Sequence, residues 1–291
     1  MNLYYKAYFY LVEKITNQQK ERMPELKKKI TSKVNERGVI KKGIALIMPS
    51  YKKFFYCDKI SGEGWFFRLK PSKSSEKRPV VIYNHGHGLN RASKNDVHMY
   101  EFYPLRKNLN QADCHQVAMH TDFSCDYNTD EYSRALDGVV DYIDKTYHNV
   151  DFNRIYLIGT SHGGYACVYE VLRNPDKFAG VVIAMSYTYN EVTVQSDETK
   201  ARLAEIQKTN KYYRVLTDED YKTLSKTPFY LAWAKNDTNN MVRSNELLYE
   251  NLEKNGGKVK TKIYDDGGHT IYSPFFKSDL WCDWLFGQER L

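Results

Sequence analysis

The chain has 291 residues, of which 42% are hydrophobic and 27% charged, and its formal net charge is +7. This balance is typical of a globular protein and excludes whole-chain disorder as well as collagen-like and coiled-coil architectures. No apolar run approaches the roughly 18 residues of a transmembrane helix, and a chain of this length can build a core without disulfides or metals.

The positive charge is concentrated near the N-terminus, where the first 60 residues contain 14 basic and 5 acidic side chains. Residues 1–37 combine apolar side chains three and four positions apart with a lysine-rich stretch, which predicts a helical extension. A solvated helix explains this charge, and docking on a membrane surface or a partner is the alternative. No nucleic-acid motif accompanies the charge, so we expect no nucleic-acid partner.

The five cysteines are scattered and form no C-x-x-C pair. This distribution argues against a zinc site and against a secreted disulfide framework. The aromatic N-terminus is not followed by the small-residue cleavage site of a signal peptide. We therefore expect a cytoplasmic protein, in a reducing compartment.

From residue 39 onward, β-rich runs alternate with amphipathic helical segments. Strands are expected at 39–48, 52–57, 64–69, 80–83, 115–123, 154–159, 180–186, 228–234 and 258–265. Helices are expected at 130–146, 163–173, 241–254 and 274–287. Several strands are apolar on both faces, so the alternation predicts an α/β domain over 38–291 with a mainly parallel central sheet flanked by helices.

The polar stretch 187–226 interrupts this alternation and contains no strand pattern. A structureless loop of that length is uncommon in a compact domain. We therefore expect a helical cap insert with its own helix near 197–208. Tyrosines of this insert could line a pocket for an aromatic or sugar-linked ester, although the abundance of tyrosine in the whole chain (25 residues) is the simpler explanation.

The run Gly159-Thr160-Ser161-His162-Gly163 fits the pattern G-x-S-x-G. A buried strand precedes it and a helix follows it, which is the context of a nucleophile elbow. The glycines allow a tight turn that exposes the serine Oγ at a helix N-terminus, where developing negative charge is stabilised. The pattern therefore predicts that Ser161 is a nucleophile, and an ordinary glycine-rich turn is the alternative.

A serine hydroxyl needs a base that accepts its proton. Of the eight histidines, only His269 lies well downstream of Ser161, directly after the last predicted strand. Asp237 follows the strand at 228–234 and is predicted to orient the imidazole, with a helix N-cap as its alternative role. Both residues follow strands of a parallel sheet, whose carboxyl edge is where ligands bind.

The sequence N-H-G-H-G follows the strand at 80–83. A backbone N–H of His87 or Gly86, together with that of His162, is predicted to form an oxyanion hole. The side chain of His85 is expected to pack under the loop. Metal sites usually include carboxylates or cysteines at helical spacing, which are missing beside these histidines. We therefore expect neither a metal nor an organic cofactor.

In the order of these motifs, residues 38–290 resemble the α/β-hydrolase superfamily, and GTSHGGY is similar to the elbow of its prolyl-oligopeptidase and dienelactone-hydrolase branches. The resemblance implies the α/β-hydrolase fold, with Ser161 as nucleophile, Asp237 as acid and His269 as base. It implies acyl transfer through a covalent intermediate. The chain has no length for the β-propeller of prolyl oligopeptidases, which favours a serine esterase acting on a small-molecule ester.

Two kinds of alternative remain beside the esterase. A peptidase, an amidase or a thioesterase would use the same residues and the same mechanism. A catalytically idle hydrolase fold would act as a binding protein. The complete set of Ser, His and Asp argues against this alternative. One fold hosts many activities, so the choice among substrates rests on the site.

Overall fold

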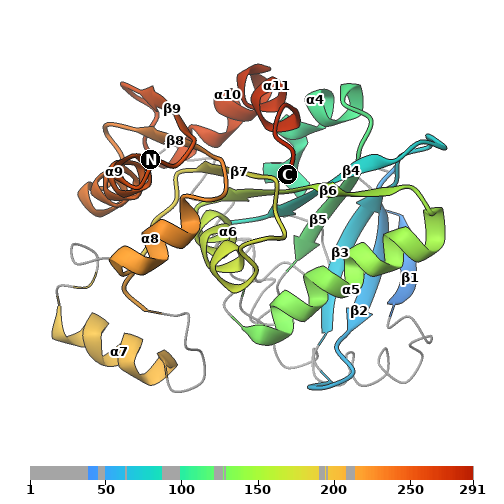
Figure 1. Cartoon of the computed structure of the whole chain (residues 1–291), viewed down its shortest axis with the longest axis horizontal. Coiled ribbons are helices and arrows are strands. Elements are labelled where there is room, and N and C mark those ends of the chain that lie inside the picture. Colours follow the sequence, from blue (N-terminus) through green and yellow to red (C-terminus); the bar gives the residue numbers. More distant parts are fainter. Residues whose placement is uncertain are drawn as a thin grey trace, which may run out of the picture.

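The computed structural model describes residues 39–44, 50–62, 64–86, 99–120, 127, 129–189, 194, 196–207 and 214–290. The helical extension predicted for 1–37 and the predicted oxyanion donor His87 lie outside the described residues. Nine strands within the described ranges form one sheet, in the order β1-β2-β3-β5-β4-β6-β7-β8-β9 (Figure 1).

The strands are β1 (Val39–Ile44), β2 (Lys52–Cys57), β3 (Gly64–Lys70), β4 (Arg78–Asn84), β5 (His115–His120), β6 (Val150–Thr160), β7 (Gly180–Ala184), β8 (Phe229–Ala234) and β9 (Val259–Tyr264). Neighbours from β1 through β3 to β5 are antiparallel. All pairs from β5 through β4 to β9 are parallel. The predicted mainly parallel sheet and the α/β class are therefore confirmed.

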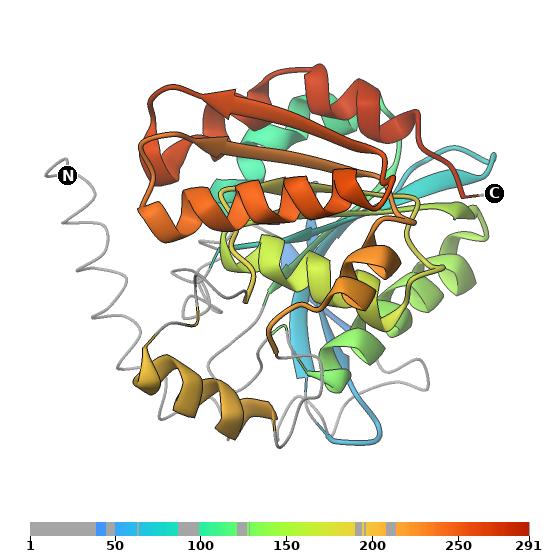
Figure 2. The same ribbon diagram turned by 60° about the vertical axis from the view of Figure 1, so that its left-hand side comes forward.

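The helices of the described ranges are α3 (Met99–Phe102), η2 (Tyr103–Leu105), α4 (Arg106–Gln111), α5 (Asp130–Tyr147), α6 (His162–Arg173), α7 (Asp197–Gln207), α8 (Asp218–Leu224), α9 (Asn239–Lys254), η3 (Gly268–Thr270), α10 (Tyr272–Lys277) and α11 (Leu280–Phe286). They cover both faces of the sheet, and Figure 2 shows β8 and β9 between α9 on one side and α10 and α11 on the other.

Two hydrophobic cores lie on the two faces of the sheet. Successive side chains of a strand point to opposite faces, so each central strand contributes to both cores. In β4, Val80 and Ile82 pack in the core shared with α5, α6, α8 and α9. Val81 and Tyr83 pack in the core shared with α4, α10 and α11. This double burial explains why the parallel strands are continuous apolar runs.

One helix was predicted too long, because residues 274–287 form two helices, α10 and α11, instead of one. Ser278 between them is extended, with φ −75° and ψ 154°. The Asn108 side chain donates to the Ser278 carbonyl at 2.6 Å, and the Trp281 indole donates to the Phe276 carbonyl at 3.1 Å. These bonds satisfy carbonyls that a continuous helix would have paired internally.

The stretch 187–226 contains α7, close to the helix expected at 197–208, and a second helix, α8, which was not predicted. Helix α8 begins with a capping box in which the Thr217 hydroxyl accepts the Asp220 N–H and the Asp220 carboxylate accepts the Thr217 N–H. This helix packs against α6 and α9, whereas α7 lies away from the sheet (Figure 1). The stretch therefore borders the element that follows the predicted nucleophile.

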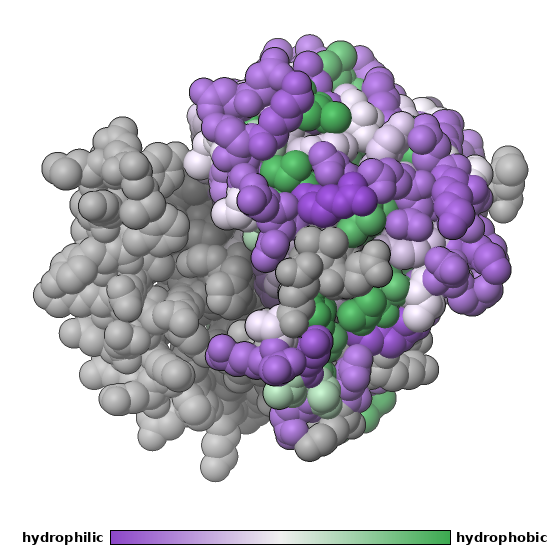
Figure 3. Space-filling model, turned by 90° about the vertical axis from the view of Figure 1, so that its left-hand side faces the viewer, coloured by the Kyte–Doolittle hydropathy of each residue, from purple (hydrophilic) through white to green (hydrophobic). Residues whose placement is uncertain are grey.

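On the face toward α9 and α7, the described side chains are mainly hydrophilic and the hydrophobic ones form small separate groups (Figure 3). Within the described ranges, no helix is both long enough and apolar enough to cross a bilayer.

Candidate active site

Ser161 occupies the sharp turn between β6 and α6. Its backbone has φ 53° and ψ −117°, a region in which any residue with a side chain is strained. The Ser161 N–H donates to the Ala184 carbonyl at 2.9 Å, and the Ser161 carbonyl accepts the Gly164 N–H at 2.9 Å. The ends of β6 and β7 and the first turn of α6 thus hold the strained serine in place.

The two glycines of the motif are required by close contacts. A Cβ on Gly163 would lie 2.0 Å from the Asn84 carbonyl oxygen at the end of β4. A Cβ on Gly159 would lie 2.3 Å from the Gly163 carbonyl oxygen. Both contacts are far shorter than van der Waals distance, so only glycine lets β4, β6 and α6 approach closely enough to form this turn.

The structure brings the three predicted catalytic residues into one hydrogen-bonded chain. His269 Nε2 lies 2.9 Å from Ser161 Oγ, and His269 Nδ1 lies 2.8 Å from Asp237 Oδ2. The Asp237 side chain is 2% exposed and that of His269 is 40% exposed. A carboxylate facing Nδ1 favours the tautomer that carries its proton there, which leaves Nε2 as the acceptor for the serine proton.

The loops that carry Asp237 and His269 are tied together by a residue that sequence reasoning missed. Asn236 Oδ1 accepts the Gly268 N–H at 2.8 Å, and Asn236 Nδ2 donates to the Asp266 carboxylate. Its position directly before Asp237, after an apolar strand, was the available signal. The amide therefore sets the distance between the loop after β8 and the loop after β9.

The predicted oxyanion donors differ in whether their N–H groups already have an acceptor. His162 is the first residue of α6, and first-turn N–H groups have no acceptor within their own helix. The Gly86 N–H donates to Glu101 Oε2 at 2.8 Å. His85 is buried as expected, and its N–H donates to the Tyr127 hydroxyl at 3.0 Å.

Glu101 is a second residue that the sequence analysis did not single out. It belongs to α3, and besides the Gly86 N–H its Oε2 accepts the Tyr83 hydroxyl at 2.9 Å. Burial raises the pKa of Glu101, while the Gly86 N–H, the Tyr83 hydroxyl and the charge of His269 act in the opposite direction. No local sequence pattern marks this glutamate, because its partners come from other elements.

Aromatic rings from the stretch 187–226 reach the elbow. The His162 ring stacks on Tyr165 with an interplanar angle of 16°, and Tyr187 stacks on the same tyrosine at 15°. Tyr189 meets Tyr165 edge-on. The insert tyrosines at 212 and 213 lie outside the described residues. Tyr187 and Tyr189 thus pack against α6, the helix that begins directly after Ser161.

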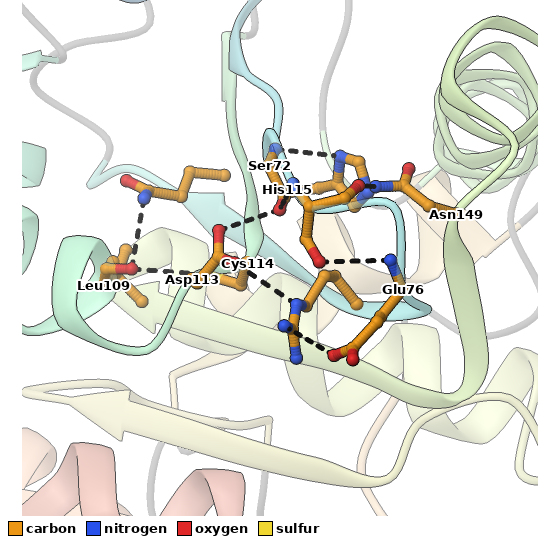
Figure 4. A network of polar contacts seen from close by, with 10 residues as sticks. Ser72, Glu76, Leu109, Asp113, Cys114, His115 and Asn149 are labelled. Carbon is orange, nitrogen blue, oxygen red and sulfur yellow. Dashed lines mark hydrogen bonds and ion pairs between the residues drawn. The ribbon is translucent and has the colours of Figure 1, made fainter.

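A second group of Ser, His and Asp side chains occupies the opposite edge of the sheet, at the amino end of β5 (Figure 4). Here the Ser72 hydroxyl donates to Asp113 at 2.7 Å, and the Ser72 N–H donates to His115 Nδ1 at 3.3 Å. The hydroxyl therefore contacts the carboxylate directly and no imidazole can take its proton. In the described part of the chain, no three His, Cys, Asp or Glu side chains are arranged to hold a metal ion.

The model of the prolyl oligopeptidase family matches residues 118–283, which is more than half of the chain and includes Ser161, Asp237 and His269. A direct search among curated proteins finds no match.

Solved structures share the fold at low sequence identity. A thermostable esterase is 19% identical with a TM-score of 0.59, over 84% of this chain and 64% of its own length. An S-formylglutathione hydrolase from Agrobacterium tumefaciens is 16% identical with a TM-score of 0.61, over 85% and 98%. The acylaminoacyl peptidase of Pyrococcus horikoshii is 14% identical with a TM-score of 0.61, over 82% of this chain and 42% of its own length. The sheet, the elbow and the family match agree on an α/β-hydrolase fold, and the chain belongs to the prolyl oligopeptidase family.

Proposed function

We propose that this member of a hydrolase family is a serine esterase, which cleaves carboxylic esters through an acyl-enzyme intermediate. The observation that carries the proposal is the chain of contacts from Ser161 Oγ through His269 to the buried Asp237 carboxylate. In the second group of Ser, His and Asp, at the other edge of the sheet, the hydroxyl has no such base. Only the first arrangement can activate a hydroxyl.

In the proposed reaction, Ser161 Oγ attacks the ester carbonyl while His269 Nε2 accepts its proton. Asp237 stabilises the imidazolium that forms. The Nε2 proton then passes to the leaving alcohol, and the acyl group stays on the serine. Water, deprotonated by the same nitrogen, releases the carboxylic acid and restores the hydroxyl.

The negative oxygen of the tetrahedral intermediate requires backbone donors beside Ser161. The N–H of His162 is proposed as one donor, because His162 directly follows the nucleophile at the start of α6. The second donor proposed is the N–H of His87, which lies outside the described residues. Gly86 is the less suitable choice, since its N–H already donates to Glu101.

Cleavage of amides by the same residues is the second candidate. The family match and the fold shared with an acylaminoacyl peptidase favour it. Esters are the default substrate because resonance stabilises an ester carbonyl less than an amide carbonyl, which makes the ester easier to attack. Thioesters belong to the same mechanistic class and are included in the test.

The test combines a fluorophosphonate probe with hydrolysis of p-nitrophenyl acetate and butyrate, an acyl thioester and an aminoacyl p-nitroanilide. We expect the wild type to be labelled and to hydrolyse the p-nitrophenyl esters, and Ser161→Ala to do neither. Ser72→Ala is the matched control, since it removes a serine that also neighbours His and Asp side chains, and it should behave as the wild type.

Three outcomes are informative. Faster turnover of the anilide or the thioester than of the esters would replace the esterase by that activity. A folded wild type that neither reacts with the probe nor hydrolyses any substrate would refute the proposal in favour of a binding protein. Residual labelling of Ser161→Ala would refute the assignment of the nucleophile.

A further inference from the structure

We propose that Glu101 is a positioning residue of the hydrolytic site, whose carboxylate holds the Gly86 peptide of the loop after β4 against the nucleophile elbow. This inference rests on the proposed function, because it concerns the rate of attack by Ser161. It assigns a role to a residue outside the Ser161, His269 and Asp237 set.

The contacts of Glu101 join three elements. Its Oε2 accepts the Gly86 N–H at 2.8 Å and the Tyr83 hydroxyl at 2.9 Å. The Tyr83 hydroxyl also lies 3.1 Å from Thr160 Oγ1, in the residue before the nucleophile. One carboxylate oxygen therefore links helix α3 to the end of β4, and the Tyr83 hydroxyl links the end of β4 to the end of β6.

Gly86 lies in direct proximity to the nucleophile. A Cβ on Gly86 would lie 3.5 Å from Ser161 Cβ and 3.1 Å from Glu101 Oε1. The carboxylate and the serine thus flank the same face of the Gly86 backbone. The residue after Gly86 carries the second proposed oxyanion donor. A displacement of the Gly86 peptide by about 1 Å would therefore weaken the stabilisation of the transition state.

Packing alone does not explain why a carboxylate occupies this position. Burial raises the pKa of Glu101, so its ionised form is less favourable in the fold than in water. An apolar side chain of similar size would fill the same volume without that cost. What the carboxylate adds is an acceptor that two donors can share, the Gly86 N–H and the Tyr83 hydroxyl.

Two substitutions separate the acceptor from the charge. Glu101→Gln keeps a carbonyl oxygen for the Gly86 N–H and the Tyr83 hydroxyl, so we expect kcat within about threefold of the wild type. Glu101→Leu removes the acceptor, so we expect kcat for p-nitrophenyl butyrate to fall about 100-fold, with KM little changed.

Glu170→Gln is the matched control. Glu170 is a buried glutamate of α6 whose pKa is also raised by burial, and it pairs with Arg173 at 2.7 Å. Its substitution should leave kcat unchanged, because its carboxylate pairs with Arg173, whereas the Gly86 N–H donates to Glu101. Tyr83→Phe provides a second route if Glu101→Leu does not fold. It removes one of the two hydrogen bonds to the carboxylate and should lower kcat about three- to tenfold.

A folded Glu101→Leu with kcat within tenfold of Glu101→Gln would overturn the positioning role. This result requires a wild type that reacts with the fluorophosphonate probe and hydrolyses esters. A wild type that does neither refutes the proposed function and is thereby distinguishable from a failure of this inference.

Discussion

At the scale of single residues, both carboxylate oxygens of Asp237 have a partner. Its Oδ1 accepts the Thr238 N–H at 2.7 Å and its Oδ2 faces His269 Nδ1. Because the side chain is 2% exposed, water cannot replace either partner. Both oxygens are committed, which leaves one orientation of the carboxylate and hence one tautomer of the imidazole.

Replacement of this carboxylate by an amide tests that arrangement. In Asp237→Asn, the amide oxygen should keep the Thr238 N–H and the amide nitrogen should face His269, which favours the wrong tautomer. We expect kcat to fall by about 10⁴-fold, as for the corresponding substitution in other Ser-His-Asp hydrolases. Ester hydrolysis and thermal unfolding measured side by side check this. A kcat within tenfold of the wild type would show that Asp237 does not orient the base.

At the scale of elements, the site depends on two loops at the carboxyl ends of neighbouring parallel strands, β8 and β9. Parallel pairing brings Ala234 opposite Tyr264, so both loops leave the same edge of the sheet. Their relative position is set by Asn236, which bonds the Gly268 N–H at 2.8 Å. Gly267, with φ 118°, provides the backbone turn before His269.

The role of this loop contact is tested by Asn236→Ala, with Lys235→Ala as control. Lys235 also joins the two loops, through an exposed ion pair with Asp265 at 2.6 Å. Exposed ion pairs contribute little to stability because water screens them, so Lys235→Ala should retain stability and kcat. Asn236→Ala should lower kcat about tenfold or more with KM nearly unchanged, because His269 is less well positioned. Equal kcat values for the two variants would contradict this role.

At the scale of the whole molecule, the central sheet carries buried titratable groups whose charged forms are destabilised by burial. The two histidines of β5 are both buried. Burial lowers the pKa of His115, and burial together with the positive charges of His85, Lys53 and Arg68 lowers the pKa of His120. Both therefore fold in the neutral form and gain affinity for a proton on unfolding.

The direction of the pH dependence follows from linkage. Between the lowered folded pKa of His115 and the unfolded value near 6.5, only the unfolded state binds the proton. Stability is therefore full above about pH 6.5 and decreases as the pH falls below it. Buried glutamates with a raised pKa, such as Glu170, act in the opposite direction, because the folded state binds the proton first as the pH falls from the raised folded pKa to the ordinary value of 4.5.

Urea unfolding at pH 7.5 and pH 5.5 measures this effect. We expect the wild-type free energy of unfolding to be lower at pH 5.5. In His115→Gln, which removes one of the two titrating rings, the difference between the two pH values should be smaller. A difference as large as that of the wild type would exclude His115 as a source of the pH dependence.

The sequence by itself determined the features that depend on near neighbours along the chain. The apolar runs and their spacing predicted the parallel sheet and the helices α5, α6 and α9, since burial on one or two faces imposes a local period. The glycines around Ser161 predicted the elbow because the turn is four or five residues long. Strand order along the chain predicted that Asp237 and His269 lie near Ser161, since their strands end at one edge, and the structure brings the three side chains together.

The tertiary structure decided the contacts between side chains that are distant in sequence. Glu101 bonds the Gly86 N–H 15 positions away, and Asn236 bonds Gly268 across 32 positions. The break between α10 and α11 is held by Asn108, 170 positions from Ser278. Local periodicity carries no information on such pairs, because a hydrogen bond across elements is formed only after the elements have packed.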